Sequence, residues 1–297
     1  MKRVTVAILF AATCSPLFGL DPALSQADQL DTAGEYEQAR TLLLTVLPAL
    51  SAPADRAEVL WRLSREQLSL GEAEQNAGRG NDAAIAAYDK GKEYAQQAID
   101  ADPSNPEGYF WKSGNMGKVG LIRGPLNSLG MVPTLQTLLS KTVQLNPTDD
   151  KAYFALGQLY AKLPGWPISF GNIDYAVSLA RKSTMLLDRR IATGAPVNVD
   201  FDFYLELARD LYQRNWDAGH RRNEQQSKLK RYTISPDIVE KSFYYEGTIN
   251  LPDESDRAEA AAIVRNTISM IQSKTAPLTS RDRSQLAEAK KLLAEWH

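Results

Sequence analysis

The sequence predicts an all-α fold, a solenoid of stacked helix pairs with insertions between the helices and capping helices at its C-terminal end. Two observations lead to this fold class: an aromatic, apolar, small, aromatic register that recurs along the chain, and two helix ends that have nearly the same sequence. The composition of the 297 residues agrees, because 43% hydrophobic and 24% charged residues are typical of a folded protein with a sizeable core.

The register is clearest in the segment that holds Tyr153, Leu156, Gly157 and Tyr160, whose spacing places all four on one face of a helix. Weaker copies occupy three other segments: Leu60, Leu63, Ser64 and Gln67; Tyr109, Lys112, Ser113 and Met116; Tyr204, Leu207, Ala208 and Leu211. We expect the small residue of each set to let a neighbouring helix approach closely.

A second helix follows each register, and two of these helices end alike. Residues 98–103 read Ala-Ile-Asp-Ala-Asp-Pro and residues 142–147 read Thr-Val-Gln-Leu-Asn-Pro, so a proline stops each helix and opens the next unit. Helix pairs of this kind are typical of tetratricopeptide repeats, which stack into a solenoid. With an N-terminal half-match from Ala27 to Val46, residues 20–231 are predicted to form degenerate tetratricopeptide-like repeats.

The repeats are longer than usual. Their small residues Ser64, Ser113, Gly157 and Ala208 are 49, 44 and 51 residues apart, whereas an ordinary unit has about 34 residues. We assign the extra residues to turns between the first and second helices, at 71–81, 120–133 and 164–171. Stacking would place these turns on one rim of the solenoid.

The period is lost after Arg231, and residues 232–252 show no clear pattern. Helices resume at Asp256, and a last helix is predicted to begin at a cap formed by Thr279 or Ser280. We therefore expect residues 232–297 to form an irregular linker and C-terminal helices packed on the same domain, with the last helix sealing the open end of the stack.

Residues 1–19 have the order of a secretory signal peptide. Lys2 and Arg3 precede the apolar stretch 4–12, and Ser15, Pro16 and Gly19 follow it. This order predicts an exported, periplasmic protein that begins near Leu20. Two alternatives stay open, a lipid anchor at Cys14, although Thr13 is unusual before a lipidated cysteine, and a buried N-terminal helix.

Composition excludes several function classes. A net charge of -2 gives no bulk attraction to nucleic acid. Two histidines and one cysteine are too few for a Cys/His metal site or a disulfide framework. The chain has no phosphate-loop, dinucleotide, zinc-protease or serine-hydrolase motif, so we expect a non-catalytic protein without a cofactor.

Charged clusters are interpreted as solvated faces. Asp202, Glu206 and Asp210 share one helical face, and the basic stretch 220–231 that follows could offset them through surface ion pairs.

Two of the insertions are unusually apolar, and they supply the candidate binding site. Residues 120–134 and 163–171 either pack over the solenoid or line an opening for an apolar ligand. The candidate ligand-binding residues are Trp111, Leu121, Ile122, Arg123, Trp166 and Phe170. Leu121, Ile122, Trp166 and Phe170 are expected around one cavity mouth, with Trp111 deeper in the groove or in the core. Arg123 either holds a carboxylate or caps helix carbonyls.

From about Trp61 to its end, the chain resembles the T component of tripartite ATP-independent periplasmic (TRAP) transporters. The resemblance lies in Tyr109-Phe110-Trp111, in Leu145-Asn146-Pro147, in the run from Leu159 to Gly171 and in the terminal helix Leu286 to Trp296. It implies an all-helical exported protein, commonly lipid-anchored, that handles a small, partly apolar solute together with a periplasmic solute-binding protein.

This hypothesis also allows a carboxylate-bearing ligand and a homo-oligomer. A similar interrupted repeat occurs in regulators of microtubule dynamics, but the signal sequence favours the exported family. The alternative function is a general tetratricopeptide scaffold that docks a peptide or protein partner in its groove.

Overall fold

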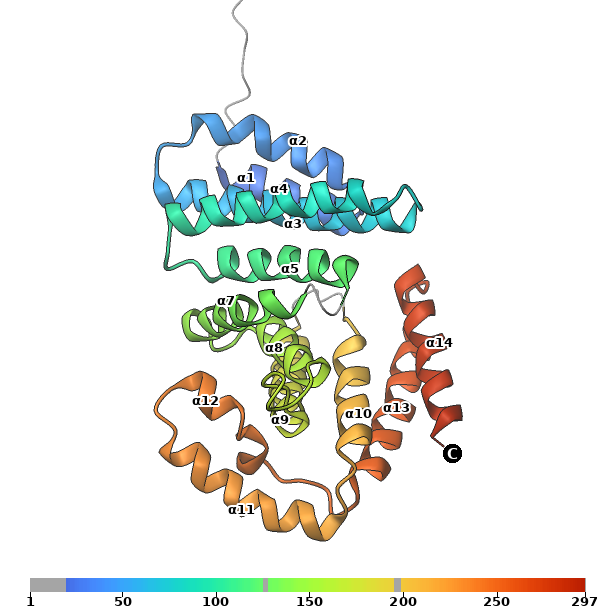
Figure 1. Cartoon of the computed structure of the whole chain (residues 1–297). Coiled ribbons are helices and arrows are strands. Elements are labelled where there is room, and N and C mark those ends of the chain that lie inside the picture. Colours follow the sequence, from blue (N-terminus) through green and yellow to red (C-terminus); the bar gives the residue numbers. More distant parts are fainter. Residues whose placement is uncertain (1–19, 125–127, 195–198, 297) are drawn as a thin grey trace, which may run out of the picture.

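The computed structural model describes residues 20–124, 128–194 and 199–296 (Figure 1). Every regular element in this part of the chain is helical, as the sequence predicts. None of the helices in these ranges is both long enough and apolar enough to cross a membrane. The signal peptide predicted for residues 1–19 lies outside the described residues.

The N-terminal layer consists of two antiparallel helix pairs. Its elements are α1 (Leu20–Thr32), α2 (Tyr36–Val46), the 3-10 helix η1 (Leu47–Ala49), α3 (Pro53–Asn76) and α4 (Asn81–Ala101). Each helix packs against the next one along the chain. Ala27 and Leu43 are completely buried in one core cluster with Val59, Leu60 and Leu63 of α3, so the helical packing extends upstream of Trp61.

The middle of the molecule continues the stack. Its elements are α5 (Pro106–Arg123), the 3-10 helix η2 (Leu129–Met131), α7 (Val132–Leu145), α8 (Asp150–Lys162) and α9 (Ile173–Ala192). Asn105, Asp149 and Asn172 cap α5, α8 and α9 by accepting hydrogen bonds from backbone N–H groups of the first turn. These caps fix where each helix of the stack begins.

The C-terminal part departs from simple alternation. Its elements are α10 (Asp202–Arg214), α11 (Ala218–Ile234), α12 (Ile238–Ser242), the 3-10 helix η3 (Tyr245–Thr248), α13 (Asp256–Gln272) and α14 (Ser280–Glu295). The packing partner of α10 is α13, which buries Ala260 and Val264 against Leu207 and Leu211. The segment of α11, α12 and η3 is thus an insertion between the two helices of the last pair, and it packs against α7 and α9.

The small residues of the repeat register lie at helix crossings. Ser64, Ser113 and Ala208 are at most 5% exposed, and Gly157 is buried where a Cβ atom would be 3.3 Å from the Cβ of Leu179. All four therefore occupy the close approaches that the register predicts.

The expected insertion at 71–81 is not a loop. Helix α3 runs on to Asn76, so α3 and α4 have 24 and 21 residues and only a short turn joins them. Gly71 lies inside α3 against the ring of Tyr88, and a Cβ atom there would be 2.3 Å from that ring. The extra residues of this unit lengthen both helices, whereas residues 163–172 do form a connection between α8 and α9. In the expected insertion at 120–133, α5 runs on to Arg123 and η2 spans Leu129–Met131, while residues 125–127 lie outside the described residues.

The acidic residues of α10 are not solvated, which corrects the interpretation from sequence. Asp202 is partly exposed, but Glu206 and Asp210 are only 6% and 2% exposed. The neighbours of Glu206 are Lys162 at the end of α8 and Arg209. Because α8 and α14 flank α10, this acidic face lies at a helix interface, a fact that the spacing of the acids does not reveal.

The basic residues of α11 also differ from the expectation of surface pairs. Arg221 and Lys228 are each 3% exposed. Arg221 pairs with Glu259 of α13, and Lys228 pairs with Asp174 of α9 as well as with Glu246 of η3. These residues hold the insertion on the stack through buried ion pairs and do not offset the acids of α10.

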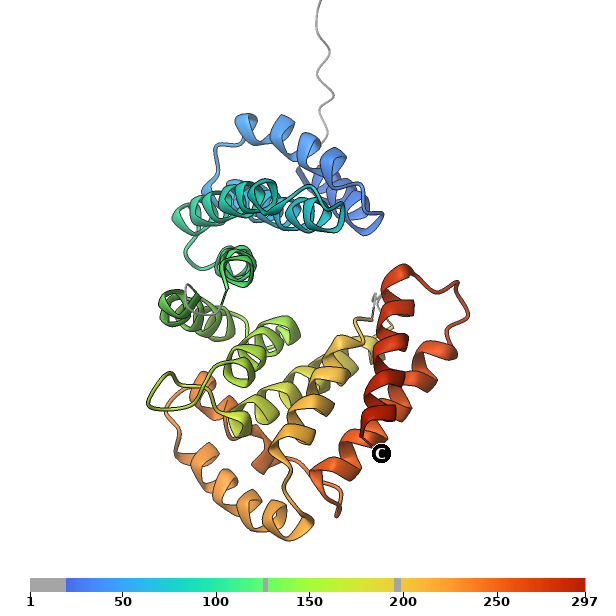
Figure 2. The same ribbon diagram turned by 45° about the vertical axis from the view of Figure 1, so that its right-hand side comes forward.

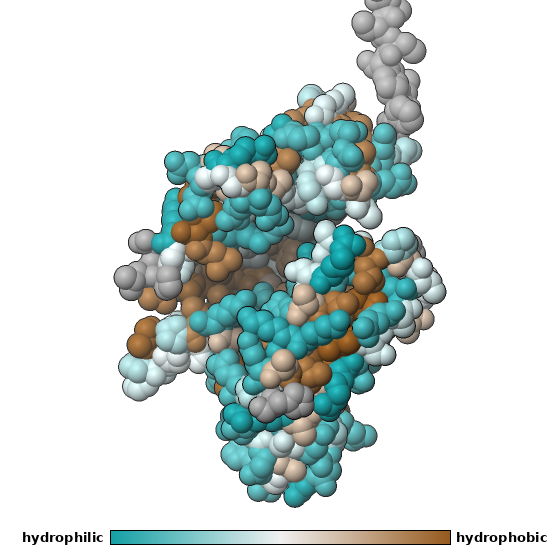
Figure 3. Space-filling model, turned by 90° about the vertical axis from the view of Figure 1, so that its right-hand side faces the viewer, coloured by the Kyte–Doolittle hydropathy of each residue, from teal (hydrophilic) through white to brown (hydrophobic). Residues whose placement is uncertain are grey.

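The whole stack is curved. Figure 2 shows the C-terminal pair, α13 and α14, turning back toward the N-terminal layer. The space-filling view in Figure 3 shows a hollow between these two parts of the molecule, with apolar residues visible inside it. The last helix begins at Thr279, which forms a capping box with Asp282, and it packs Leu293 and Trp296 on the core beside α10.

Candidate functional site: an acidic groove in the N-terminal layer

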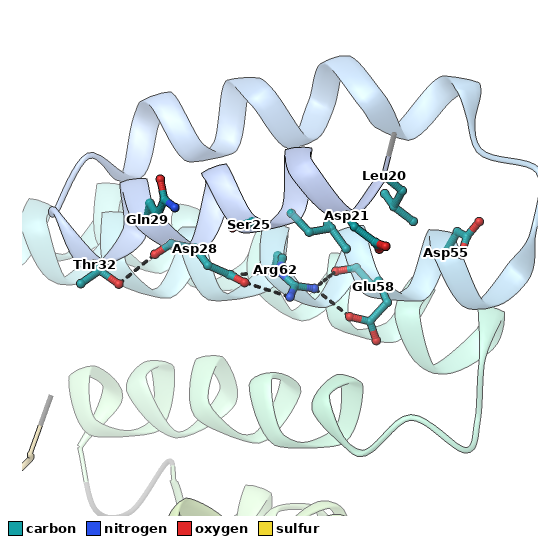
Figure 4. Close-up of a pocket in the computed structure, with 10 residues that line it drawn as sticks. Leu20, Asp21, Ser25, Asp28, Gln29, Thr32, Asp55, Glu58 and Arg62 are labelled. Carbon is teal, nitrogen blue, oxygen red and sulfur yellow. Dashed lines mark hydrogen bonds and ion pairs between the residues drawn. The ribbon is translucent and has the colours of Figure 1, made fainter. Parts of the chain in front are cut away.

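A groove of about 760 Å³ lies between α1 and the N-terminal half of α3 (Figure 4). Both helices turn their apolar faces inward, where Leu24 of α1 packs with Leu60 and Trp61 of α3. Their polar faces are left to line the groove. We call this the N-terminal acidic groove, and its lining consists of Leu20, Asp21, Leu24, Ser25, Asp28, Gln29, Thr32, Asp55, Glu58 and Arg62.

The groove has an excess of negative charge. Its lining contains four carboxylates and one guanidinium. Arg62 donates to both carboxylate oxygens of Asp28 at 3.0 Å and to Glu58 at 2.7 Å. Asp21 and Asp55 make no ion pair with any described residue, so two carboxylates of the groove remain uncompensated.

Asp28 is the fixed anion of the groove. Burial raises the pKa of its carboxyl group, but hydrogen bonds and charges from Arg62 and Arg65 outweigh burial and hold the pKa below its usual value. Arg65 donates to Asp28 at 2.8 Å. Asp28 therefore stays ionised and orients both arginines, while Asp21 and Asp55 are available to a ligand.

Acidic residues continue from the groove along the stack. Asn105, the cap of α5, donates to Glu58 at 2.8 Å, and Glu107 follows in the first turn of α5. Asp149 is the cap of α8, the next first helix. Burial raises the pKa of Glu107, the charge of Asp149 raises it further, and burial also raises the pKa of Asp149. The charge of Lys151 opposes both shifts without cancelling them, so these two acids are compensated only in part.

Glu66 of α3 extends this set into the interior. Its side chain is 0% exposed, and only one of its carboxylate oxygens has a partner, Arg65 at 2.8 and 3.0 Å. Burial is the largest cause that raises the pKa of Glu66 to about 7, against the opposing charge of Arg65. The other oxygen is a buried acceptor with no donor among the described residues.

The structure separates the site residues predicted from sequence into exposed and packed groups. Leu121 at the end of α5 is 75% exposed and Trp166 in the α8–α9 connection is 89% exposed. Ile122 packs beside Val119 and Met131, and the ring of Phe170 lies 5.1 Å from that of Tyr160. Neighbouring residues of each insertion thus point in different directions.

Trp111 and Arg123 complete the predicted set. Trp111 is half-buried, and its indole N–H donates to Glu107 at 2.9 Å, which places it beside the acids that continue from the groove. Arg123 is exposed in the last turn of α5. None of the six residues lines the N-terminal acidic groove or the smaller pocket of about 460 Å³ beside Tyr109 and α7. Their role in ligand binding stays a prediction.

The sequence analysis missed the groove because its residues come from helices that are distant in the chain. Asp21 and Asp28 precede Asp55 and Glu58 by about one repeat, and nothing local marks them as neighbours. One signal was present: first helices begin with acids, at Asp55, Glu107 and Asp150. Acids in a first turn are ordinary helix-stabilising residues, so this signal acquires meaning only once the helices are stacked.

The described residues also contain no group of three or more His, Cys, Asp or Glu side chains arranged to hold a metal ion. The chemistry of the groove is therefore that of paired and unpaired carboxylates on a helical surface.

Stacked antiparallel helix pairs with small residues at their crossings define the class of this protein, a helical-repeat protein of tetratricopeptide type. The model of one protein family, described as regulator of microtubule dynamics protein 1-3, matches residues 23–163, which is just under half of the chain. This is the second family that the interrupted repeat resembles, and the T component of TRAP transporters is not the family that matches.

Among solved structures, the chain is similar to a thermophilic TPR protein of Thermus thermophilus. The identity is 18%, the TM-score is 0.49, and the similarity covers 77% of this chain and 99% of that one. No curated protein matches the chain.

Proposed function

We propose that this protein is a non-catalytic docking scaffold that binds a basic segment of a partner polypeptide in the N-terminal acidic groove. The observation that carries the proposal is a groove of about 760 Å³ with four carboxylates and one guanidinium, two of the carboxylates being unpaired. Lysine and arginine side chains of a partner supply the charges that the groove lacks.

A polypeptide suits this surface better than a small cation. The acids are spread from α1 through α3 to Glu107 of α5 and Asp149 before α8, so an extended partner can reach several of them in turn. Each partly exposed ion pair contributes only about 0.2 to 1 kcal/mol. Useful affinity therefore needs several basic residues along the segment, and it should fall as salt screens the charges.

The direct test replaces the two unpaired carboxylates, with Asp21→Asn and Asp55→Asn combined in one variant. Binding of a fluorescent lysine- and arginine-rich peptide is measured by anisotropy at low and high salt, with a peptide of reversed charge as the negative probe. We expect the basic peptide to bind the unmodified chain, and the double variant to bind it about five- to tenfold more weakly, which corresponds to about 1 to 1.4 kcal/mol.

Asp82→Asn is the matched control. Asp82 is also an acid in the first turn of a helix, α4, but it is exposed and lies outside the groove. Equal affinities of the double variant and the unmodified chain, or equal binding of both peptides, would contradict the proposal.

A narrower hypothesis remains from the resemblance to the T component of TRAP transporters. In it, the protein is exported to the periplasm and handles a small apolar solute with a solute-binding protein. The exposed apolar side chains of Leu121 and Trp166 favour a contact of that kind. Native mass spectrometry that finds a co-purifying small molecule, lost in Trp111→Ala or Trp166→Ala, would support it; amino-terminal sequencing of material from cells would test export and anchoring at Cys14.

A further inference from the structure

The connection between α8 and α9, residues 163–172, has an apolar tip in solvent. Its sequence, Leu-Pro-Gly-Trp-Pro-Ile-Ser-Phe-Gly-Asn, contains no charged residue. Residues 164–168 are all exposed, and among them Trp166 and Ile168 are 89% and 71% exposed. Figure 2 shows this yellow-green connection projecting from the stack on the left. Two large apolar side chains on one uncharged tip indicate a contact surface, because apolar groups that gather in water usually meet a partner.

The backbone of the connection is closed by its own hydrogen bonds. The N–H group of Gly171 donates to the carbonyl oxygen of Pro164 at 3.0 Å, and the N–H group of Ile168 donates to that of Gly165 at 3.1 Å. At the base, the ring of Phe170 packs inward on the aromatic core. The base of the connection is therefore part of the stack, and its tip is held outward.

Charged residues flank the connection, and its acids are already paired. Glu206 of α10 pairs with Arg209 at 2.7 Å and with Lys162, the last residue of α8, at 3.8 Å. Asp174, in the first turn of α9, pairs with two buried cations from α10 and α11. The side chain of Lys162 is 63% exposed. An exposed ammonium group thus stands at the start of the apolar tip.

We propose that this tip inserts into the boundary between headgroups and acyl chains of a phospholipid bilayer, with Trp166 and Ile168 as the inserted side chains. Tryptophan is the residue type that prefers this boundary, and a lysine beside it places its ammonium group among the headgroup phosphates. Because none of the helices in the described ranges could cross a membrane, the contact is a peripheral one.

A bilayer suits the tip better than a protein partner does. A stable protein interface buries about 1,200 to 2,000 Å² in total, far more than five exposed residues offer. A bilayer instead accepts single side chains, and its affinity grows with the apolar area that they bury. The N-terminal acidic groove belongs to α1 and α3, so membrane contact at the tip does not depend on a partner bound in that groove.

The test measures co-sedimentation of the full chain with phosphatidylcholine vesicles. We expect the unmodified chain to bind, and a variant that combines Trp166→Ala with Ile168→Ser to partition into the vesicles at least about tenfold more weakly, because it loses most of the apolar area of the tip. The circular dichroism of this variant should match that of the unmodified chain, since both substituted residues are exposed.

Tryptophan fluorescence locates the contact. Brominated phosphatidylcholine, which quenches only tryptophans that enter the bilayer, should quench part of the emission of the unmodified chain, and Trp166→Phe should abolish this quenching. Residues 4–12 are apolar but contain no tryptophan. Vesicle binding without quenching, or equal binding of the unmodified chain and the double variant, would therefore assign attachment to another segment and overturn the proposal.

Leu44→Ala is the matched control, since Leu44 is a 41% exposed leucine of α2, outside the connection. Its vesicle binding should equal that of the unmodified chain, and a similar loss in this variant would contradict a specific role of the tip. Absence of vesicle binding at millimolar lipid would also overturn the proposal. Self-association without lipid that the double variant abolishes, measured by analytical ultracentrifugation, would assign the tip to a second copy of the chain instead.

Discussion

Gly157 in α8 occupies a position without room for a side chain, because a Cβ atom would lie 3.3 Å from the Cβ of Leu179 and 3.6 Å from the carbonyl oxygen of Ala176. Both neighbours belong to α9, which packs along α8. At the scale of single residues, the spacing between helices of the stack depends on such small residues, and Ser64, Ser113 and Ala208 serve in the other units.

Gly157→Leu should therefore destabilise the fold. Inserting a large side chain into a packed helix crossing costs about 1 to 3 kcal/mol, whereas Trp166→Ala removes a side chain that is 89% exposed and should change the free energy of unfolding by less than about 0.5 kcal/mol. Urea denaturation of both variants measures the difference. Equal midpoints for Gly157→Leu and the unmodified chain would show that α8 and α9 do not meet at Gly157.

Glu66 gives a pH dependence at the same scale. Because its pKa is raised to about 7, the folded protein binds more protons than the unfolded chain between about pH 4.5 and 7, and its contribution to stability falls as pH rises through that window. Glu66→Gln should remove this fall, on the order of 1 to 3 kcal/mol. Denaturation of both proteins at pH 5.5 and pH 8 measures this fall in stability. If the variant loses as much stability as the unmodified chain when the pH is raised, groups other than Glu66 cause the loss.

At the scale of elements, the segment of α11, α12 and η3 is held on the stack by a buried network of charges. Arg181, Arg214 and Lys228 all pair with Glu246, which is 1% exposed. Burial alone would raise the pKa of Glu246, but these three cations hold the pKa well below its usual range. An ion network of this kind stabilises little by itself, yet removing one partner leaves the others uncompensated.

Glu246→Gln should accordingly destabilise the protein by about 3 to 5 kcal/mol. Because the pKa of Glu246 is depressed in the folded protein, Glu246 contributes fully to stability at pH values above the ordinary pKa of a glutamate. This contribution is lost only as the pH falls through the lower pKa of the folded state. The variant should therefore differ most from the unmodified chain near neutral pH.

The control for this network is Asp253→Asn, which breaks a pair with Arg222. The side chains of Arg222 and Asp253 are 61% and 74% exposed, so the substitution should cost less than about 1 kcal/mol. Similar losses for the two variants, measured by thermal denaturation monitored by circular dichroism, would place the network among ordinary surface pairs.

At the scale of the whole molecule, the stack ends in a helix that covers its apolar side. Trp296, directly after α14, stacks on Tyr212 of α10 at 4.3 Å between ring centres, and Ala289 is completely buried against the core shared by α10 and α13. A repeat stack needs such a terminal helix, because the outermost unit otherwise exposes its packing face. Helix α14 also turns back toward the N-terminal layer, and it forms one side of the hollow visible in Figure 3.

Ala289→Glu should open this end of the stack. It places a charge in an apolar contact without a partner, at a cost of about 3 to 5 kcal/mol, and exposure of the underlying face should promote self-association in size-exclusion chromatography with light scattering. Lys290→Glu changes the next residue, which is exposed, and should leave the protein as stable as before. Equal behaviour of the two variants would mean that α14 does not cover the core.

The sequence alone determined the all-helical class, the first helix of each unit and the boundaries between the units. Periodicity located the first helix of each unit, prolines at 103 and 147 marked the unit boundaries, and the small residues were placed correctly at the crossings. These features are local, because the register, the caps and the helix breaks depend on residues within a few turns of one another.

Only the tertiary structure decided which charged residues are buried and where the grooves lie. In the sequence, Arg221 and Lys228 look like residues of a solvated helix, and Glu206 and Asp210 look like residues of a solvated face. The sequence pattern of a charged residue is the same whether water or another helix covers its side chain. The pairing of α10 with α13, which the whole insertion separates in the chain, also left no local signal. The N-terminal acidic groove therefore arises from packing, since it gathers side chains from α1 and α3, which are neighbours only in the folded protein.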